Sequence, residues 1–285
     1  MFVTTVFAPA KINLTLDIVG TRDDGYHLLE SIFQSVDICD AVVARKRLGR
    51  RITLDAPGCV CPVEKNTAYK AAVAFFRYTG LNKGVHLTVK KHIPQQAGMG
   101  GGSADAAGVL VALNKLFKTN LTTAQLCEIG LTIGADVPFC VMGGTAYVTG
   151  IGEGLQPLPA LPDCTIVVAQ PAEGISTKEA YAAVDNANIL ARPDNAAAIA
   201  ALEQGDLNGV CAQAINVFEA ATELSGVKDI RRRMEQYHPL CSQMTGSGSC
   251  VFAIFADEDA ADACLADLQT AYPTAFICYP CNGIL

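Results

Sequence analysis

The most constraining feature of the sequence is a glycine-rich segment that leads into an apolar helix. Residues 94–107 read PQQAGMGGGSADAA, with glycine at four of the five positions from Gly98 to Gly102. From Ala104 to Phe117, apolar residues recur every three or four positions, which predicts a helix packed on a sheet. Glycine allows positive φ angles and a close approach to a ligand, and the first N–H groups of a helix are unpaired. The segment therefore suits a bound polyphosphate.

Two familiar nucleotide-binding patterns do not describe this segment. No Gly-Lys-Ser/Thr follows at the spacing of a Walker loop, and the third glycine of a dinucleotide fingerprint would fall on Ser103. One interpretation is a flexible connection in which Ser103 caps the helix. The other is a different kind of phosphate loop, in which the Ser103 hydroxyl meets a phosphate oxygen or a magnesium ion. The two are compatible, since Ser103 can cap the free helix.

The composition narrows the classes of protein. The chain has 285 residues, 51% of them hydrophobic and 17% charged, which predicts packed cores and two lobes. A net charge of −7 argues against a general nucleic-acid or anionic-membrane surface. No apolar run reaches the ~18 residues of a membrane span, and the start lacks the basic segment of a secretory signal. We expect a soluble, cytoplasmic protein, either a monomer or a homodimer.

Twelve cysteines are scattered through the chain, many of them in apolar stretches. Most are expected to be buried thiols that pack as small hydrophobic side chains. Two close pairs, Cys59 with Cys61 and Cys278 with Cys281, leave open half a zinc site or a redox pair. No histidine stands at ligand spacing from either pair.

A β-hairpin is predicted near the start of the chain. Apolar and polar residues alternate from Lys11 to Ile18, which is the period of a half-buried strand and places Lys11 and Asn13 on one face. Turn residues at 21–25 precede an extended segment from Tyr26 to Val36. A helix over 66–78 and a strand over 85–89 are expected to follow.

The stretch from Gly150 to Pro162 contains glycine and proline and resembles a boundary between lobes. We therefore expect one lobe at 1–158 and a second at 159–285. In the second, the pattern predicts strands over 165–170, 250–255 and 275–279, and helices over 208–224, 227–237 and 260–272. This alternation is typical of a small α+β sandwich.

Asp136 and Lys11 form a candidate catalytic pair. Asp136 precedes an apolar stretch with a proline in its first turn, which is typical of a helix N-cap, and Lys11 taken alone is typical of an exposed strand lysine. Together they supply what phosphorylation of an alcohol needs, because a carboxylate can take the hydroxyl proton and a cation can offset developing charge. Whether the two side chains meet is left open by the sequence.

Three stretches, taken together, resemble the motifs of the GHMP kinases, the superfamily of galactokinase, homoserine kinase, mevalonate kinase and phosphomevalonate kinase. They are residues 9–14, PAKINL; the Gly98 to Ala107 loop; and residues 244–252, MTGSGSCVF. Further details resemble the branch that acts on 4-diphosphocytidyl-2-C-methyl-D-erythritol, over about Ala8 to Phe255. These details are GYH at 25–27, GADVPF at 134–139 and IST at 175–177.

The resemblance implies a two-lobed α+β fold, with a first lobe like ribosomal protein S5 domain 2 and a ferredoxin-like second lobe. It implies ATP-dependent phosphorylation of the 2-hydroxyl of that substrate, with Mg²⁺, in the non-mevalonate route to isoprenoid precursors. Asp136 and Lys11 would be catalytic. The ATP-binding residues implied are Asn66, Pro94, Gly98, Met99, Gly100, Gly101, Gly102, Ser103 and Ala104, with Ser103 also a metal ligand. The substrate-binding residues implied are Asn13, Tyr26, His27, Thr177, Tyr181, Gly246 and Ser247.

Within that set, Asn13 would hold the substrate diol, Tyr26 and Tyr181 would stack on cytosine, and His27 would hydrogen-bond the base edge. Two positions depart from the common pattern. Ala104 stands where many members have a second serine, so more of the phosphate or metal contact falls on Ser103; Tyr181 stands where phenylalanine also occurs. Two other functions remain open: another small-molecule kinase of the superfamily, of the mevalonate or homoserine type, and a nucleotide-binding regulatory module without chemistry.

Overall fold

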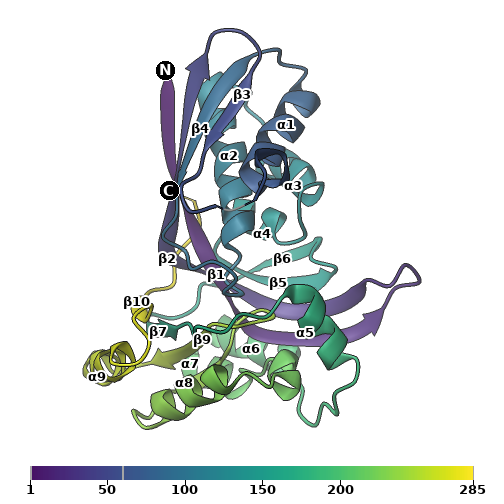
Figure 1. Ribbon diagram of the computed structural model, residues 1–285. Coiled ribbons are helices and arrows are strands. Elements are labelled where there is room, and N and C mark those ends of the chain that lie inside the picture. The colour runs from purple at the N-terminus through teal and green to yellow at the C-terminus, as the bar shows by residue number, and fades with distance from the viewer. Residues whose placement is uncertain (1, 60, 285) are drawn as a thin grey trace.

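Two β-sheets organise the chain, which the computed structural model describes over residues 2–59 and 61–284 (Figure 1). The first sheet has the strand order β3-β4-β2-β5-β6, with β1 paired to β2. Its β3 and β4 run parallel, and its other described pairs are antiparallel. Its strands are β1 (Val3–Thr21), β2 (His27–Arg47), β3 (Ile52–Asp55), β4 (Gly84–Lys90), β5 (Thr145–Gly150) and β6 (Gly154–Leu158).

Helices cover one face of the first sheet (Figure 1). They are the short η1 (Val63–Lys65), α1 (Thr67–Thr79), α2 (Gly101–Phe117), α3 (Thr123–Leu131) and α4 (Val137–Met142). Helix α2 packs directly on β1 and β2 and is buried along most of its length. Its Gly108 makes this close approach possible, because a Cβ at that position would lie 2.8 Å from Cγ2 of Val42.

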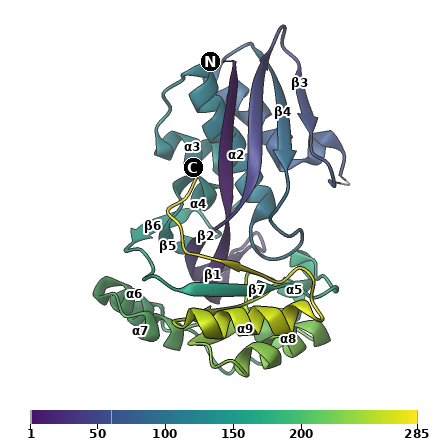
Figure 2. The same ribbon diagram turned by 90° about the vertical axis from the view of Figure 1, so that its left-hand side faces the viewer.

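The second sheet has the order β10-β7-β9-β8, all antiparallel. Its strands are β7 (Thr165–Ala169), β8 (Cys241–Met244), β9 (Val251–Phe255) and β10 (Phe276–Cys278), and α8 (Ser225–Glu235) and α9 (Glu258–Gln269) pack on it (Figure 2). Chain order β7-α8-β8-β9-α9-β10 is the ferredoxin-like arrangement. An insertion after β7 carries α5 (Thr177–Val184), α6 (Asn195–Gln204), α7 (Leu207–Ala212) and η2 (Val217–Ala221). The predicted two-lobed α+β fold is confirmed.

The β1–β2 hairpin joins the two lobes, because its strands are long enough to contact both. Its first half carries first-lobe core residues such as Val6 and Ala8. Near its tip, Thr15 Oγ1 donates to Asn195 Oδ1 at 2.6 Å, and the Leu16 N–H donates to the Ile215 carbonyl at 2.9 Å. The alternation that predicted this hairpin is confirmed, but both strand faces are buried between Ala8 and Leu16, because the second lobe covers the polar one.

Helix α2 begins earlier than the apolar pattern predicts. Gly100 is its N-cap residue, with φ of 72°, and the helix starts at Gly101. The interpretation of Ser103 as the N-cap is therefore wrong: Ser103 lies in the first turn. A left-handed glycine at position 100 lets the chain turn sharply, so that the glycines after it become helical.

One other expectation on chain organisation is wrong. The last strand of the first sheet, β6, ends at Leu158, and the first strand of the second sheet, β7, begins at Thr165. The helix predicted over 208–224, in contrast, ends at Ala212 and resumes only as the short η2. It is interrupted at Asn216, whose side chain accepts from the Phe218 N–H and donates to the carbonyls of Met244 and Gly246. Asparagine interrupts helices in this way because its amide competes for backbone groups.

Candidate active site

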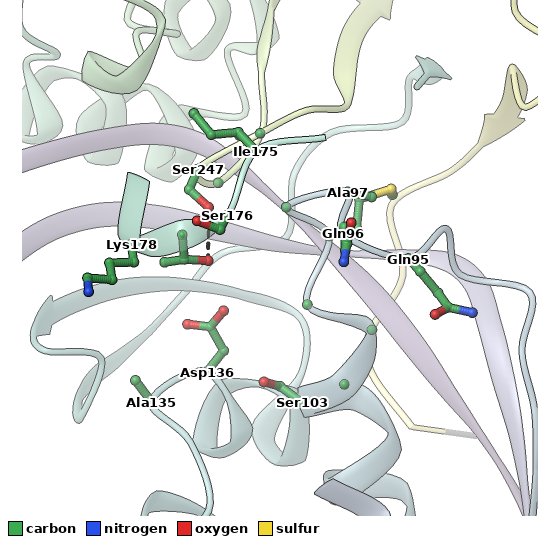
Figure 3. A pocket seen from close by; sticks show the side chains of 18 of the residues that line it. Gln95, Gln96, Ala97, Ser103, Ala135, Asp136, Ile175, Ser176, Lys178 and Ser247 are labelled. Atoms are coloured by element: carbon green, nitrogen blue, oxygen red, sulfur yellow. Dashed lines mark hydrogen bonds between the residues drawn. The ribbon is translucent and has the colours of Figure 1, made fainter. Parts of the chain in front are cut away.

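A cavity of about 1100 Å³ lies between the lobes, with walls from both (Figure 3). Nearly every residue singled out from the sequence lines it, although these residues come from distant parts of the chain. They are Lys11, Asn13, Tyr26, His27, Asn66, Pro94, Gly98 to Ser103, Asp136, Thr177, Tyr181, Gly246 and Ser247. Ala104 is the exception among them, because it is fully buried and does not line the cavity.

The glycine loop offers backbone donors to this cavity. The N–H groups of Ser103 and Ala104 both donate to the Gly100 carbonyl at 2.9 Å. The N–H groups of Gly101 and Gly102 precede them at the helix start, where no earlier turn can supply acceptors, so they can meet an anion with the positive end of the α2 dipole.

The start of α1 packs against the start of α2. Thr67 Oγ1 donates to the Gly102 carbonyl at 2.6 Å. The predicted ATP-binding residue Asn66 is the N-cap of α1, and its Oδ1 accepts from the Ala68 N–H at 2.9 Å. The side chain of Asn66 thus has a structural task, while its position on the cavity wall leaves ligand contact open.

Lys11 is held by the glycine loop. Its N–H donates to the Met99 carbonyl at 3.1 Å, and its side-chain stem packs against Gly100, where a Cβ would lie 3.1 Å from Cγ of Lys11. The ammonium lies 3.9 Å from Oδ2 of Asp136 and 4.7 Å from the centre of the Phe33 ring. Burial lowers the pKa of Lys11, and the Asp136 carboxylate opposes this shift. The two predicted catalytic side chains therefore converge.

Asp136 occupies the N-cap position of α4, as the sequence predicts, but its side chain makes no capping hydrogen bond. Its backbone is already helical, with φ of −82° and ψ of −10°, whereas a side chain that caps a helix usually comes from an extended residue. The carboxylate points into the cavity near Ser103 (Figure 3) and is 33% exposed. A carboxylate that is reachable from the cavity and close to an ammonium is suited to accept a proton from a bound hydroxyl.

Asn13 connects the lysine to the second lobe. Its Oδ1 accepts from the Lys11 ammonium at 2.6 Å, the Gly246 N–H at 2.9 Å and Thr245 Oγ1 at 3.3 Å. Its Nδ2 donates to Ser31 Oγ at 3.0 Å. Asn13 therefore orients Lys11 against the turn at 245–248, and its predicted contact with a substrate diol stays a prediction.

The turn after β8 forms the second-lobe wall of the site. Gly246, with φ of 56°, lies directly against Gly98 of the glycine loop, and Ser247 Oγ is 3.3 Å from Thr177 Oγ1 at the start of α5. Asn216 and Thr245 hold this turn in place. Sequence reasoning missed both, and the only signal for Asn216 was a polar residue inside an otherwise helical pattern.

An aromatic cluster also lines the cavity. The His27 ring stacks on Tyr181 with 4.6 Å between ring centres, and His27 Nε2 is 2.7 Å from Asp185 Oδ1. Phe218 meets the Tyr181 ring edge-on at 5.0 Å. Burial raises the pKa of Tyr181 to about 12, and the Asp136 charge adds to the shift. Tyr26 lies at the rim and is 61% exposed. Sequence reasoning missed Asp185 and Phe218.

The close cysteine pairs show no metal centre. Over residues 2–59 and 61–284, no three His, Cys, Asp or Glu side chains are grouped as metal ligands. The Cys59 and Cys61 sulfurs lie 3.1 Å apart at the cavity edge, and all twelve cysteines are free thiols. Five cysteines are buried and the others are at least partly exposed, so the expectation that most are buried is only partly met.

Comparison with known proteins decides the family. The model of the GHMP kinase N-terminal domain matches residues 66–144, and that of the GHMP kinase C-terminal domain matches residues 193–274. The chain belongs to the GHMP kinase family. It is therefore a small-molecule kinase that uses ATP, which confirms the resemblance drawn from the motifs.

The sequences of similar proteins align with nearly the whole length of this chain. The 4-diphosphocytidyl-2-C-methyl-D-erythritol kinase of Clostridium tetani is 41% identical over 273 residues, 95% of this chain and 97% of that one. The enzyme of the same name from Clostridium perfringens is 43% identical over 88% of each chain. A crystal structure of 4-(cytidine 5′-diphospho)-2C-methyl-D-erythritol kinase has a TM-score of 0.83 at 32% identity, covering 98% of this chain and all of that one.

More distant members share the fold alone. A homoserine kinase structure from Cytophaga hutchinsonii has a TM-score of 0.78 at 19% identity, covering 100% of this chain and 97% of that one. In the described part of the present chain, no helix has the length and apolar character of a membrane span.

Proposed function

We propose that this GHMP kinase transfers the γ-phosphoryl group of ATP to the 2-hydroxyl of 4-diphosphocytidyl-2-C-methyl-D-erythritol, a step toward isoprenoid precursors. One observation carries the chemistry: the Lys11 ammonium and the Asp136 carboxylate, 3.9 Å apart, line the same cavity as the glycine loop. The full-length similarity to kinases of that name supports the choice of acceptor.

In the mechanism, the triphosphate lies on the free N–H groups of Gly101 and Gly102, with its outer end toward Asp136. The acceptor oxygen attacks the γ-phosphorus, the bond to the bridging oxygen breaks, and ADP leaves. The hydroxyl proton passes to the Asp136 carboxylate. Lys11 stabilises the charge on the transferring group, and its burial among Phe33 and the backbone of the loop strengthens that interaction by excluding water.

The aromatic cluster in the cavity is suited to the cytidine. We assign Tyr26 and Tyr181 to stacking on the base and His27 to its polar edge. His27 covers one face of Tyr181, so a base that stacks on that face must displace the His27 ring. Before the base binds, the Asp185 carboxylate holds this ring in place. Thr177, Gly246 and Ser247 line the same cavity as Lys11. The Oδ1 of Asn13 already accepts from three donors, so we assign Asn13 to positioning Lys11. Contact with the substrate diol is proposed as a second role of the same residue.

Magnesium is proposed to enter with ATP. Mg²⁺ keeps several waters and takes a small number of protein oxygens besides those of substrate phosphates. The Ser103 hydroxyl fits this requirement, because it projects into the cavity beside Asp136 from the first turn of α2 (Figure 3). The ion would neutralise charge on the phosphates, and the protein holds the phosphate oxygens through the loop amides.

Each lobe is proposed to supply one part of the site. Residues 1–158 contain the glycine loop, Lys11 and Asp136, and residues 159–285 contribute Thr177, Tyr181 and the turn at Gly246. The division is not strict, because the end of the chain returns to the first lobe, where the Cys281 N–H donates to the Ser35 carbonyl at 2.9 Å.

The test is ADP release by the purified protein with three acceptors: the diphosphocytidyl substrate, mevalonate and homoserine. Turnover with the first, and a new phosphate on the 2-hydroxyl in the ³¹P and ¹H NMR spectra, is the expected result. Turnover with mevalonate or homoserine alone would favour another GHMP kinase. A protein that binds ATP but phosphorylates none of the three would favour a regulatory module.

A further inference from the structure

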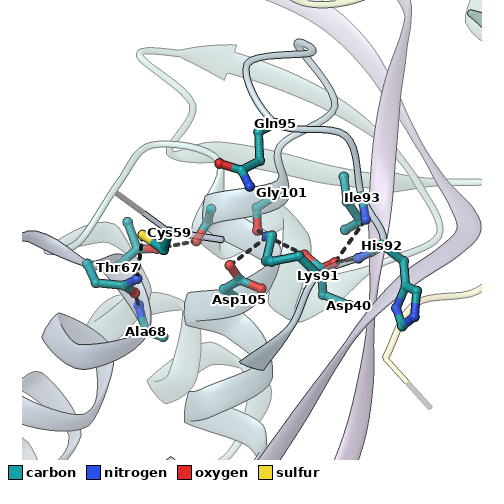
Figure 4. Close-up of polar contacts among 12 residues, drawn as sticks. Asp40, Cys59, Thr67, Ala68, Lys91, His92, Ile93, Gln95, Gly101 and Asp105 are labelled. Carbon is teal, nitrogen blue, oxygen red and sulfur yellow. Dashed lines mark hydrogen bonds and ion pairs between the residues drawn. The ribbon is translucent and has the colours of Figure 1, made fainter. Parts of the chain in front are cut away.

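A largely buried ionic cluster joins the two ends of the glycine loop (Figure 4). Lys91, just after β4 and before the loop, donates from its ammonium to Asp105 Oδ2 at 2.7 Å and lies 3.4 Å from the Gly101 carbonyl. Gly101 and Asp105 stand one turn apart at the start of α2. The lysine therefore ties the segment that enters the loop to the helix that leaves it.

Asp40 completes the cluster from β2. The Lys91 ammonium also donates to Asp40 Oδ2, and Asp40 Oδ1 accepts from the N–H groups of His92 at 2.6 Å and Ile93 at 2.9 Å. Asp40 is completely buried. It holds both the Lys91 side chain and the two backbone positions that lead into the loop.

Asp105 has one oxygen that this network does not use. Its Oδ1 is buried and has no hydrogen-bond partner among the described residues. A buried carboxylate with half of its hydrogen-bonding capacity unused is costly. The packing of α2 does not require a carboxylate at position 105, since an apolar side chain would fill the same space without that cost. The interaction that offsets the cost is the contact of Asp105 with the Lys91 ammonium.

The loop needs such a restraint. With four glycines between residues 98 and 102, it has more conformational freedom to lose on ordering than other segments of its length. Closing its ends before the nucleotide arrives lowers the entropy cost that binding would otherwise carry.

We propose that Asp105 and Asp40 are positioning residues of the nucleotide site, which act through Lys91 to hold the glycine loop in its phosphate-binding conformation. The inference rests on the proposed binding of the triphosphate at Gly101 and Gly102. It adds two carboxylates that the resemblance to the family did not single out, and Asp105 and Lys91 also line the cavity.

The test measures the Kd of a non-hydrolysable ATP analogue by calorimetry, in magnesium-containing buffer and without acceptor. Burial raises the pKa of Asp105 to about 7, against the opposing effect of Lys91, so the Kd is measured at a pH well above that value, where Asp105 is charged. Under these conditions Asp105→Asn, which keeps the shape and removes the charge, is expected to raise this Kd about tenfold, through lost preorganisation. The KM of the acceptor is expected to stay within about twofold, because its subsite is built from other elements. Asp229→Asn is the matched control, since it breaks ion pairs with Arg232 and Arg233 on α8, away from the cavity.

A double-mutant cycle tests the route through Lys91. In a Lys91→Met background, Asp105→Asn is expected to change the Kd by less than about twofold, because the partner it acts on is gone. An equal rise in Kd in both backgrounds, or an equal rise in the acceptor KM, overturns the proposal. Because the analogue is tested without acceptor, failure of the proposed substrate would leave this result intact.

Hydrogen exchange on the wild-type protein gives a result that does not depend on the variants folding. Without nucleotide, amides of residues 95–103 that exchange well below the rate of an unstructured chain support a preformed loop. Exchange at the rate of an unstructured chain overturns the proposal.

Asp105→Ser, with the same charge removed and a smaller side chain, replaces Asp105→Asn in the binding measurements if the latter variant does not fold.

Discussion

Gly98 of the glycine loop and Gly246 of the second lobe meet backbone to backbone. A Cβ on Gly246 would lie 2.7 Å from the Gly98 carbonyl oxygen, and one on Gly98 would lie 2.1 Å from the Thr245 carbonyl oxygen. Both residues have positive φ, of 74° and 56°. The contact sets how closely the two walls of the site approach each other, and it exists only because neither residue has a side chain.

Gly98→Ala is therefore expected to separate the two walls and to lower kcat/KM by roughly tenfold or more, since sub-ångström positioning of reacting groups governs catalysis. Gly80→Ala is the matched control. Gly80 has φ of 67° and nothing within 4 Å of an added Cβ, so it carries similar backbone strain without the clash. Steady-state kinetics and thermal melts of both variants separate the two effects. Equal kinetic losses in both would show that strain alone is responsible.

Asp136→Asn is expected to lower kcat by more than ~100-fold, the scale of a positioned acid–base group. The Kd of an ATP analogue should change little, because the loop amides that hold the phosphates are untouched. Single-turnover measurements with saturating ATP report the chemical step directly. Unchanged turnover would show that Asp136 does not take the proton and would favour a site without this chemistry.

The alkaline limb of the pH profile reports Lys11. Burial holds the pKa of Lys11 below its ordinary 10.5, so the ammonium loses its proton at a lower pH than an exposed lysine. An activity that needs the charged form must therefore fall as pH rises through that lowered pKa. We expect log(kcat/KM), which reports the free enzyme, to begin its decline at a pH below the ordinary lysine pKa of 10.5. Adding ADP to the assay at each pH checks that the coupling enzymes are not rate-limiting. A kcat/KM that stays constant up to pH 10.5 would exclude a catalytic ammonium at Lys11.

Tyr181→Ala is expected to raise the KM of the diphosphocytidyl acceptor by about tenfold or more, on the scale of one base–aromatic stack. The KM of ATP should stay unchanged, and Tyr181→Phe should behave nearly as wild type because stacking is preserved. Tyr78→Ala, at an exposed tyrosine on α1 outside the cavity, controls for loss of an aromatic ring. A rise in the KM of both substrates would place Tyr181 in the structural core of the site.

Much of the site was predictable from local pattern. The alternation around Lys11 and Asn13 predicted a strand with both side chains on one face, and the glycine run before an apolar helix predicted an anion site. These signals are local, because backbone freedom and side-chain periodicity depend on neighbouring residues. The start of α2 was predicted three residues late for the same reason. Gly100 is left-handed and lies against the Lys11 side chain, a contact between distant residues that no local pattern records.

The amino-acid sequence by itself determined which short segments could bind an anion, pair as strands or form helices. It also determined the family, because the motifs occur in a characteristic order. The tertiary structure alone decided that Lys11 meets Asp136, that His27 stacks on Tyr181, and that Asn216 holds the Gly246 turn. Such contacts join residues far apart in the chain. They are set by the pairing of strands and by the packing of the two lobes on one hairpin. The free energies of pairing and packing are sums over many residues, so the local sequence around two contacting residues does not show that they meet.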